Sequence, residues 1–129
     1  MREIKFRAWD FENNEMIPGD ALAFEEYAPI CELLTQEGVM QYTGLRDSRR
    51  TEEYPEGQEI YESDIIIFFE ELEFVNKLPK TAYMKVTFER GCFWGENTDW
   101  QEPLFELIDD GEIYVKGNVF ENPELAEKL

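Results

Sequence analysis

Two segments, each with the pattern of a short strand that ends in a turn, constrain the fold of this chain more than any other feature. The first spans residues 40–47, where Gly44 has the conformational freedom that a sharp change of direction requires. The second spans residues 60–66 and ends in an isoleucine-rich run typical of a buried strand. Neither segment contains a catalytic or ligand-binding motif, so both indicate the fold of the chain and not a reaction.

Alternation of apolar and polar residues predicts antiparallel hairpins elsewhere in the chain, because a period of two is the pattern of half-buried strands. Asn13 and Asn14 are suited to the tip of the first hairpin. Asp110 and Gly111 form a dipeptide that favours a tight turn in the last one. The predicted hairpins are 4–9 with 15–17, 82–88 with 92–94, and 104–108 with 113–115.

The remaining segments predict single strands and loops. Residues 48–57 are polar and contain Pro55 and Gly57, which favours an exposed loop. Pro29 argues against one long helix in that part of the chain. The other predictions are a strand at 39–43 that Gly44 ends, two extended pieces within 21–34, a short turn or 3₁₀ piece at 59–61, a buried strand at 64–69, and loops at 70–80 and 97–103.

The C-terminal residues have the pattern of a short helix. Asn122 is a good N-cap, Pro123 fits the first helical position, and Glu124 complements the positive end of the helix dipole. Leu125 and Leu129 would share one face. A helix of about two turns is therefore expected.

The pattern as a whole predicts a mainly β fold. Residues 58–120 are expected to form a small antiparallel barrel or half-barrel, because closure protects the edges of short strands. An N-terminal β-hairpin region would pack against it. The 129 residues fit a single domain, which can divide into two lobes, 1–57 and 58–129.

The second strong feature is charge: 30 acidic residues stand against 12 basic ones, a formal net charge of −18. Such a surface repels phosphate backbones and anionic membranes, so neither direct nucleic-acid binding nor membrane binding is expected. A basic protein partner, a bound cation or mimicry of nucleic acid would suit it. The alternative interpretation is that the charge serves solubility alone.

The chain contains no histidine, which removes the commonest general base and nearly all zinc sites. Cys31 and Cys92 do not have a metal-ligand spacing and are expected to be reduced thiols. No cofactor is therefore predicted. The N-terminal residues lack the pattern of a signal peptide and no apolar run approaches the length of a membrane span, so a cytoplasmic protein is expected.

Four segments are specific when taken together. They are Lys5-Phe6-Arg7-Ala8-Trp9-Asp10 with Met16-Ile17, Gln41-Tyr42-Thr43-Gly44-Leu45-Arg46-Asp47, Glu59-Ile60-Tyr61-Glu62-Ser63-Asp64-Ile65, and Gly117-Asn118-Val119-Phe120-Glu121-Asn122-Pro123-Glu124-Leu125. With these segments in this order, the chain resembles the YopX protein family of phages and prophages over residues 5–125. The last three are similar to the family patterns Q-Y-T-G-L-x-D, E-I-Y-E-G-D-I and G-N-I-Y-E-N-P-E-L.

The resemblance implies a mostly β fold, a phage or prophage origin and a location in the bacterial cytoplasm. It supplies no catalytic residues, because the family is one without an assigned biochemical role. Two departures are visible. Ser63 stands where the family usually has glycine, so a tight backbone there must tolerate a β-carbon. The loop at 48–58 is longer than the family's usual short connection, which indicates an insertion in a surface loop.

Three aspartates, each at a strand end or a turn, are the best candidates for catalysis. If Asp10, Asp47 and Asp64 converged, they could hold Mg²⁺ or Mn²⁺ and support hydrolytic or phosphoryl-transfer chemistry. Their spacing is that of no metal motif. The alternative is that each carboxylate caps its own turn by accepting hydrogen bonds from nearby backbone N–H groups.

Three other groups of side chains are candidates for a binding surface: polar residues around the tryptophan of the first strand, residues just before Gly44, and an aromatic cluster near a hairpin. The structural alternatives are paired strand charges, cross-strand bonds and aromatic rings that cover the end of a barrel. The candidate binding residues are Lys5, Arg7, Trp9, Asp10, Gln41, Tyr42, Phe93, Trp94 and Trp100.

Together these observations predict a non-catalytic phage or prophage accessory protein that acts by binding or oligomerisation. A homo-oligomer is expected, with strand edges or the aromatic cluster at the contact. A basic host or phage protein is the other expected partner. Two alternatives are the metal-dependent enzyme described above and an acidic DNA mimic that inhibits a host nucleic-acid-binding protein, with acidic pairs at 52–53, 70–71 and 109–110.

Overall fold

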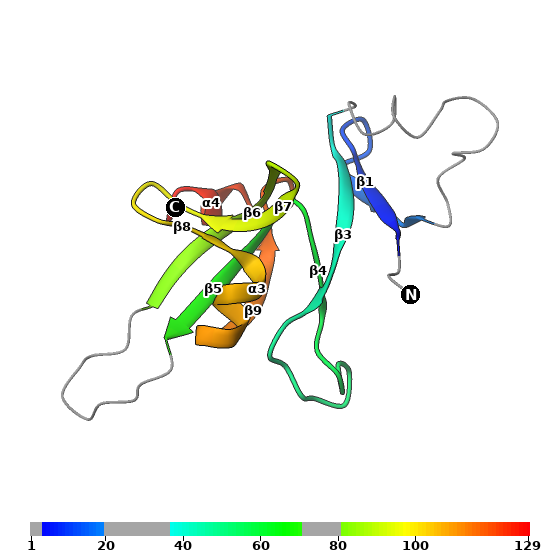
Figure 1. The fold of residues 1–129 in the computed structure, drawn as a ribbon. Coiled ribbons are helices and arrows are strands. Elements are labelled where there is room, and N and C mark those ends of the chain that lie inside the picture. The colour runs from blue at the N-terminus through cyan, green and yellow to red at the C-terminus, as the bar shows by residue number, and fades with distance from the viewer. Residues whose placement is uncertain (1–3, 20–36, 71–80) are drawn as a thin grey trace.

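The computed structural model describes residues 4–19, 37–70 and 81–129. Within these residues the chain forms two antiparallel sheets and two short helices (Figure 1). The four-stranded sheet has the strand order β2-β1-β3-β4, and the five-stranded sheet has the order β8-β7-β6-β5-β9. The predicted mainly β fold with a half-barrel is confirmed.

The elements follow one another along the chain with short connections in most places. The first sheet contains β1 (Phe6–Asp10), β2 (Glu15–Ile17), β3 (Val39–Arg46) and β4 (Glu59–Tyr61). The second contains β5 (Asp64–Glu70), β6 (Thr81–Glu89), β7 (Cys92–Glu96), β8 (Gln101–Pro103) and β9 (Gly111–Asn118). The helices are α3 (Leu104–Asp110) and α4 (Pro123–Ala126).

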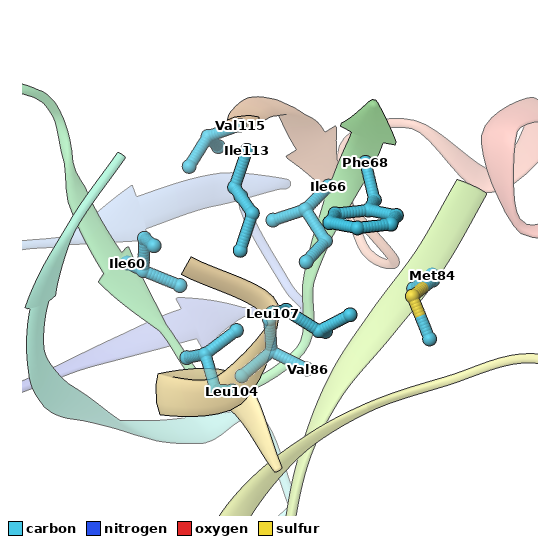
Figure 2. Close-up of a cluster of buried hydrophobic side chains, with 9 residues drawn as sticks. All are labelled: Ile60, Ile66, Phe68, Met84, Val86, Leu104, Leu107, Ile113 and Val115. Atoms are coloured by element: carbon cyan, nitrogen blue, oxygen red, sulfur yellow. The ribbon is translucent and has the colours of Figure 1, made fainter. Parts of the chain in front are cut away.

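The main core lies between the five-stranded sheet and α3 and reaches across to the first sheet. In β5 the residues from Asp64 to Phe68 are all buried, which explains why this strand is a continuous apolar run rather than an alternating one. Ile60 of β4 also belongs to the core, so one hydrophobic cluster joins the two sheets. Its buried members, labelled in Figure 2, are Ile60, Ile66, Phe68, Met84, Val86, Leu104, Leu107, Ile113 and Val115.

Two of the three predicted hairpins are confirmed. β1 and β2 pair with Trp9 opposite Met16, and the tip contains Asn14 at a φ of 53°. β6 and β7 pair with Val86 opposite Gly95 around the turn at Arg90 and Gly91. The alternation of side chains was a sufficient signal in both cases, because each hairpin has one face against apolar neighbours.

The third predicted hairpin is wrong: residues 104–110 form the helix α3 and not a strand. Leu104 and Leu107 are one helical turn apart and are both buried, and Ile108 also packs against the core. This i, i+3, i+4 spacing is the apolar stripe of a helix, whereas residues three apart in a strand face opposite sides. The prediction therefore gave too much weight to the turn signal of Asp110 and Gly111. Gly111 has an extended φ of −176° and begins β9 instead of forming a hairpin turn.

Three boundaries also differ from the predictions. Gly44 does not end a strand: β3 continues through it to Arg46, and the pairing with β4 shifts register between Tyr42 and Arg46. This irregularity, with Gly44 at a φ of 83°, has the character of a β-bulge. Residues 59–61 form the strand β4 rather than a turn, and residues 101–103, predicted as loop, pair with β7 as β8.

The predicted C-terminal helix is confirmed in position and is shorter than expected. α4 begins at Pro123 with Asn122 at the N-cap and has four residues, about one turn. The Asn122 side chain does not cap the helix; its Oδ1 accepts a hydrogen bond from the Asn118 N–H at 3.2 Å. The expected extended pieces at 21–34, the loop at 71–80 and Cys31 lie outside the described residues, and Cys92 is a free thiol.

The predicted strain at Ser63 is present, since this residue adopts a φ of 67° in the turn between β4 and β5. Its backbone is held on both sides: the Ser63 N–H donates to Val86 O at 2.8 Å, and Ser63 O accepts from the Val119 N–H at 3.0 Å. A left-handed conformation is unfavourable for a residue with a β-carbon. Because glycine would keep both backbone bonds and remove the strain, the turn is better suited to glycine than to serine.

We therefore predict that Ser63→Gly increases the free energy of unfolding by about 0.5–1 kcal/mol, as measured by urea denaturation. The matched control is Gly44→Ala. A β-carbon at Gly44 would meet no atom within 4 Å, so its cost arises from the φ of 83° alone. This variant should lose about 1 kcal/mol. Two changes of the same sign would contradict the assignment of strain to Ser63.

Candidate functional site

Asp47, at the end of β3, is a fully buried carboxylate that is surrounded by donors. Its Oδ1 accepts hydrogen bonds from the N–H groups of Gln58 at 2.7 Å and Arg49 at 3.1 Å. Its Oδ2 accepts from the Val115 N–H at 3.0 Å and from Arg49 Nη1 at 2.9 Å. A buried charge requires such compensation, and here the donors come from three separate parts of the fold.

The residues around Asp47 cover the outer edge of β9 in place of another strand. Ser48 exchanges two bonds with Ile113: its N–H donates to Ile113 O at 2.8 Å, and its Oγ accepts from the Ile113 N–H at 2.9 Å. Arg49 Nη2 donates to Val115 O at 2.8 Å. Backbone groups on an open strand edge otherwise invite pairing with another chain. The Asp47–Arg49 segment therefore protects this edge and ties β3 to the second sheet.

Asp64 is the second buried carboxylate and lies where the two sheets meet. Its Oδ2 accepts a hydrogen bond from the Tyr61 N–H at 2.8 Å, which caps the turn between β4 and β5. Its Oδ1 forms an ion pair with Arg7 Nη2 from β1. The Arg7 guanidinium also lies over the Tyr61 ring, with 4.2 Å between Cζ and the ring centroid. β1, β4 and β5 thus converge on one charge pair.

Burial raises the pKa of Asp64 from 3.8 to about 6, against the opposing effect of the Arg7 charge and the Tyr61 N–H. The negative charge of Glu121 adds a small upward contribution to the pKa. Burial also raises the pKa of Glu62, whose Oε1 accepts the Gln41 N–H at 2.9 Å. Carboxyl groups in this region are therefore easier to protonate than ordinary surface acids.

The third aspartate has a different environment. Asp10 is partly exposed and ends β1 just before the hairpin tip, where hydrogen bonds from Asn13, then from Glu12, lower its pKa. Asp10, Asp47 and Asp64 each accept a hydrogen bond from a backbone N–H two or three residues away, so the turn-capping interpretation is confirmed. Among the residues that the structure describes, no group of three or more acidic or cysteine side chains could hold a metal ion.

Four of the candidate binding residues, Lys5, Arg7, Gln41 and Tyr42, come together on the first sheet. Lys5 forms an ion pair with Glu59 and lies 4.9 Å from the centroid of the Tyr42 ring. The Tyr42 and Tyr61 rings are 5.5 Å apart. These contacts all join β1, β3 and β4 to one another, so the chain itself supplies partners for this group.

The predicted aromatic cluster is not one surface. Phe93 packs against the main core and its ring lies 4.9 Å from that of Phe88. Trp94 is on the opposite face of β7, where its indole N–H donates to Glu89 O at 2.9 Å and Arg90 lies over its ring at 5.2 Å. Trp100 packs edge-on against Phe68 at 5.3 Å, in the core.

Two of the candidates line surface grooves. Trp100 lines a groove of about 430 Å³ beside Lys128 and Leu129, and Trp9 lines a different one. The Trp9 groove has a volume of about 590 Å³ and lies between the β1–β2 hairpin and the turn before α4. The Trp9 ring stacks on Phe120, with centroids 6.1 Å apart and planes 12° apart, and Phe11 meets Phe120 edge-on at 5.6 Å. The residues that line it are Trp9, Asn14, Glu15, Met16, Phe120, Glu121 and Pro123.

Sequence analysis missed most of this groove. Met16 could have been found, because the predicted hairpin register places it opposite Trp9 on the same face. Phe120 and Glu121 come from the other end of the chain, and no local pattern brings them to β1. The groove is therefore a product of the packing of the two sheets.

Comparison with known proteins agrees with this architecture, that of a two-sheet antiparallel protein. The model of a family described as YopX protein matches residues 5–127, and the chain belongs to this family. The fold is similar to the crystal structure of protein EF1440 from Enterococcus faecalis, with a TM-score of 0.60 and 22% identity over 98% of this chain and 99% of that one. No curated protein matches the chain. In the described part of the chain, no helix has the length and apolar character needed to cross a membrane.

The raised pKa of Asp64 predicts a specific pH dependence of stability. Between about pH 4 and about pH 6 the folded protein binds more protons at Asp64 than the unfolded chain does. The contribution of Asp64 to the free energy of unfolding is therefore fully present below pH 3.8 and is lost as the pH rises through about 6. We expect wild type to lose about 2–3 kcal/mol of unfolding free energy as the pH rises across this window, and Asp64→Asn not to show this loss. Urea denaturation of both proteins at each pH measures the difference.

Asp10→Asn is the control for this experiment. The pKa of Asp10 is lowered, so its contribution is present above its usual pKa of 3.8 and is lost only at more acidic pH. Between about pH 4.5 and about pH 7 the free energy of unfolding of this variant should change with pH in the same way as that of wild type. A difference between wild type and Asp64→Asn that does not change with pH would show that the carboxyl does not titrate in this window.

A separate prediction concerns Asp47. Asp47→Asn replaces one acceptor oxygen by a donor that faces N–H groups, and it leaves Arg49 without its charge partner. We expect a loss of about 3 kcal/mol in the free energy of unfolding. Exchange of the Val115 amide hydrogen, followed by NMR, should accelerate more than that of Met84 in the middle of the sheet. Equal protection of both amides in the variant would contradict the role of Asp47 at the β9 edge.

Proposed function

We propose that this protein is a phage- or prophage-encoded accessory protein of the bacterial cytoplasm that acts by binding a basic protein and not by catalysis. The observation that carries the proposal is the excess of carboxylates, 30 against 12 basic residues. A surface of this kind accelerates encounter with a positively charged partner and repels nucleic acid.

The structure adds to this argument because many of the basic side chains are already engaged within the chain. Lys5, Arg7 and Arg49 form ion pairs with internal carboxylates. Arg90 and Lys128 lie over the rings of Trp94 and Tyr83. Each ion pair uses one carboxylate and each ring contact keeps its cation in place, so the net charge of −18 remains on carboxylates that these cations do not neutralise.

The enzyme alternative has no comparable support. Asp47 and Asp64 are buried and saturated with donors from the chain, and Asp10 caps an exposed hairpin tip. A carboxylate that general acid–base or metal chemistry uses must reach a substrate or an ion. Each of the three aspartates lies in a different part of the fold and stabilises the backbone there.

Two variants of the binding proposal differ in their partner. In one, the acidic surface mimics DNA and occupies a host nucleic-acid-binding protein. In the other, the protein associates with itself, and the exposed Phe88, 48% accessible beside Phe93, offers an apolar surface for the contact. Salt distinguishes self-association from binding to a basic protein, because screening weakens attraction between opposite charges and weakens repulsion between two copies of an acidic chain.

The test is affinity capture from a bacterial lysate with the immobilised protein at about 50 mM and about 500 mM NaCl, followed by sedimentation of the purified components. We expect basic proteins to bind at low salt and to be lost at high salt. Competition by duplex DNA for the same partner would identify the DNA-mimic variant. Association of the chain with itself that strengthens with salt, without a basic partner, would overturn the proposal in favour of a homo-oligomer.

A further inference from the structure

We infer that the groove between the β1–β2 hairpin and the turn before α4 receives an arginine or lysine side chain from an extended, basic segment of a partner protein. This inference rests on the proposed function for the kind of partner and adds the place and chemistry of contact. The aromatic rings, the carboxylates and the backbone that holds them each contribute to it.

The first contribution is the aromatic surface. Trp9 and Phe120 lie nearly parallel, with planes 12° apart and centroids 6.1 Å apart, and together they form a broad apolar wall. Phe11, whose side chain is 51% exposed, extends this wall through its edge contact with Phe120. The face of an aromatic ring attracts a cation through its quadrupole, and tryptophan does so most strongly.

The chain already uses this chemistry elsewhere. Arg90 lies over Trp94 at 5.2 Å, and Lys128 lies over Tyr83 at 5.0 Å. Within the described residues, no cation of the chain lies over Trp9 or Phe120. The groove therefore presents the same kind of surface as Trp94 but leaves it open to a cation from another molecule.

The second contribution is the charge at the rim. Glu15 and Glu121 are exposed, line the groove from its two sides, and form no ion pair with any described residue. Glu121 is also close enough to Asp64 to raise the pKa of that group. A guanidinium or ammonium group against this aromatic wall would meet two carboxylates, whereas an anionic ligand would be repelled.

The third contribution is a backbone that fixes both walls before binding. Asn118 Oδ1 accepts hydrogen bonds from the N–H groups of Phe120 at 3.0 Å and Glu121 at 2.8 Å. On the other wall, Asp10 Oδ1 accepts the Glu12 N–H at 2.9 Å and holds the hairpin tip. A preformed site loses less conformational entropy when it binds a ligand than a mobile site does.

The probe is a ten-residue arginine-rich peptide, compared with the same peptide in which citrulline replaces arginine. Citrulline keeps the shape of the side chain and lacks its charge. The readout is a ¹⁵N NMR titration, in which Trp9, Trp94 and Trp100 each give one indole N–H signal. We expect the arginine peptide to shift the Trp9 signal with little effect on Trp94, and the citrulline peptide to leave all three signals in place.

Two variants make the test specific. Trp9→Ala should weaken binding of the arginine peptide about fivefold, and Trp94→Ala, which removes an indole that Arg90 already covers, should not weaken it. The double variant Glu15→Gln with Glu121→Gln changes exposed side chains only, so folding should be retained; it should weaken binding and reduce its dependence on salt.

The outcomes separate this inference from the proposed function. If the peptide binds in a salt-dependent way but both variants bind like wild type, the groove is the wrong site and the acidic surface still binds basic partners. If the peptide fails to bind while basic proteins are captured from lysate at low salt, the inference also fails alone. If neither binds, both are wrong.

Discussion

The rest of the structure depends on the hydrogen bonds that converge on the Asp47 carboxylate. Its donors are the N–H of Gln58 at the start of the return to β4, the N–H of Val115 on the edge of β9, and Arg49. A buried negative charge is stable only when such donors replace the water that it loses on folding. One side chain therefore determines where β3 ends, where the chain returns, and how the two sheets are joined.

The Arg7–Asp64 pair acts at the other side of the same junction and explains the position of the groove. Arg7 holds β1 against the first residue of β5, which pairs with Asn118 at the end of β9. Trp9, two residues beyond Arg7 on the same face of β1, then meets Phe120, two residues beyond Asn118. The position of the groove thus follows from the buried charge pair.

Sequence reasoning succeeded where one face of a strand is apolar, as in β6 with Met84 and Val86 inside and Lys85 between them. It failed at residues 104–110, where Leu104, Leu107 and Ile108 have a helical spacing. The Asp-Gly dipeptide that follows favoured a hairpin turn, and the segment was interpreted as a strand. The turn-capping role of the aspartates was open to prediction from residue type. The groove was not, because it needs the contact of Trp9 with Phe120 across most of the chain.

The long connection between β3 and β4 has a practical meaning. Its two ends are fastened together, since the Asp47 N–H donates to Gln58 O at 2.8 Å, while Thr51, Glu52 and Glu53 lie exposed at its far end. Adding chain to a loop whose ends already meet costs little closure entropy. This site can accept an inserted epitope or fluorescent label without displacing either sheet, and it offers a handle for observing the protein with its termini left free.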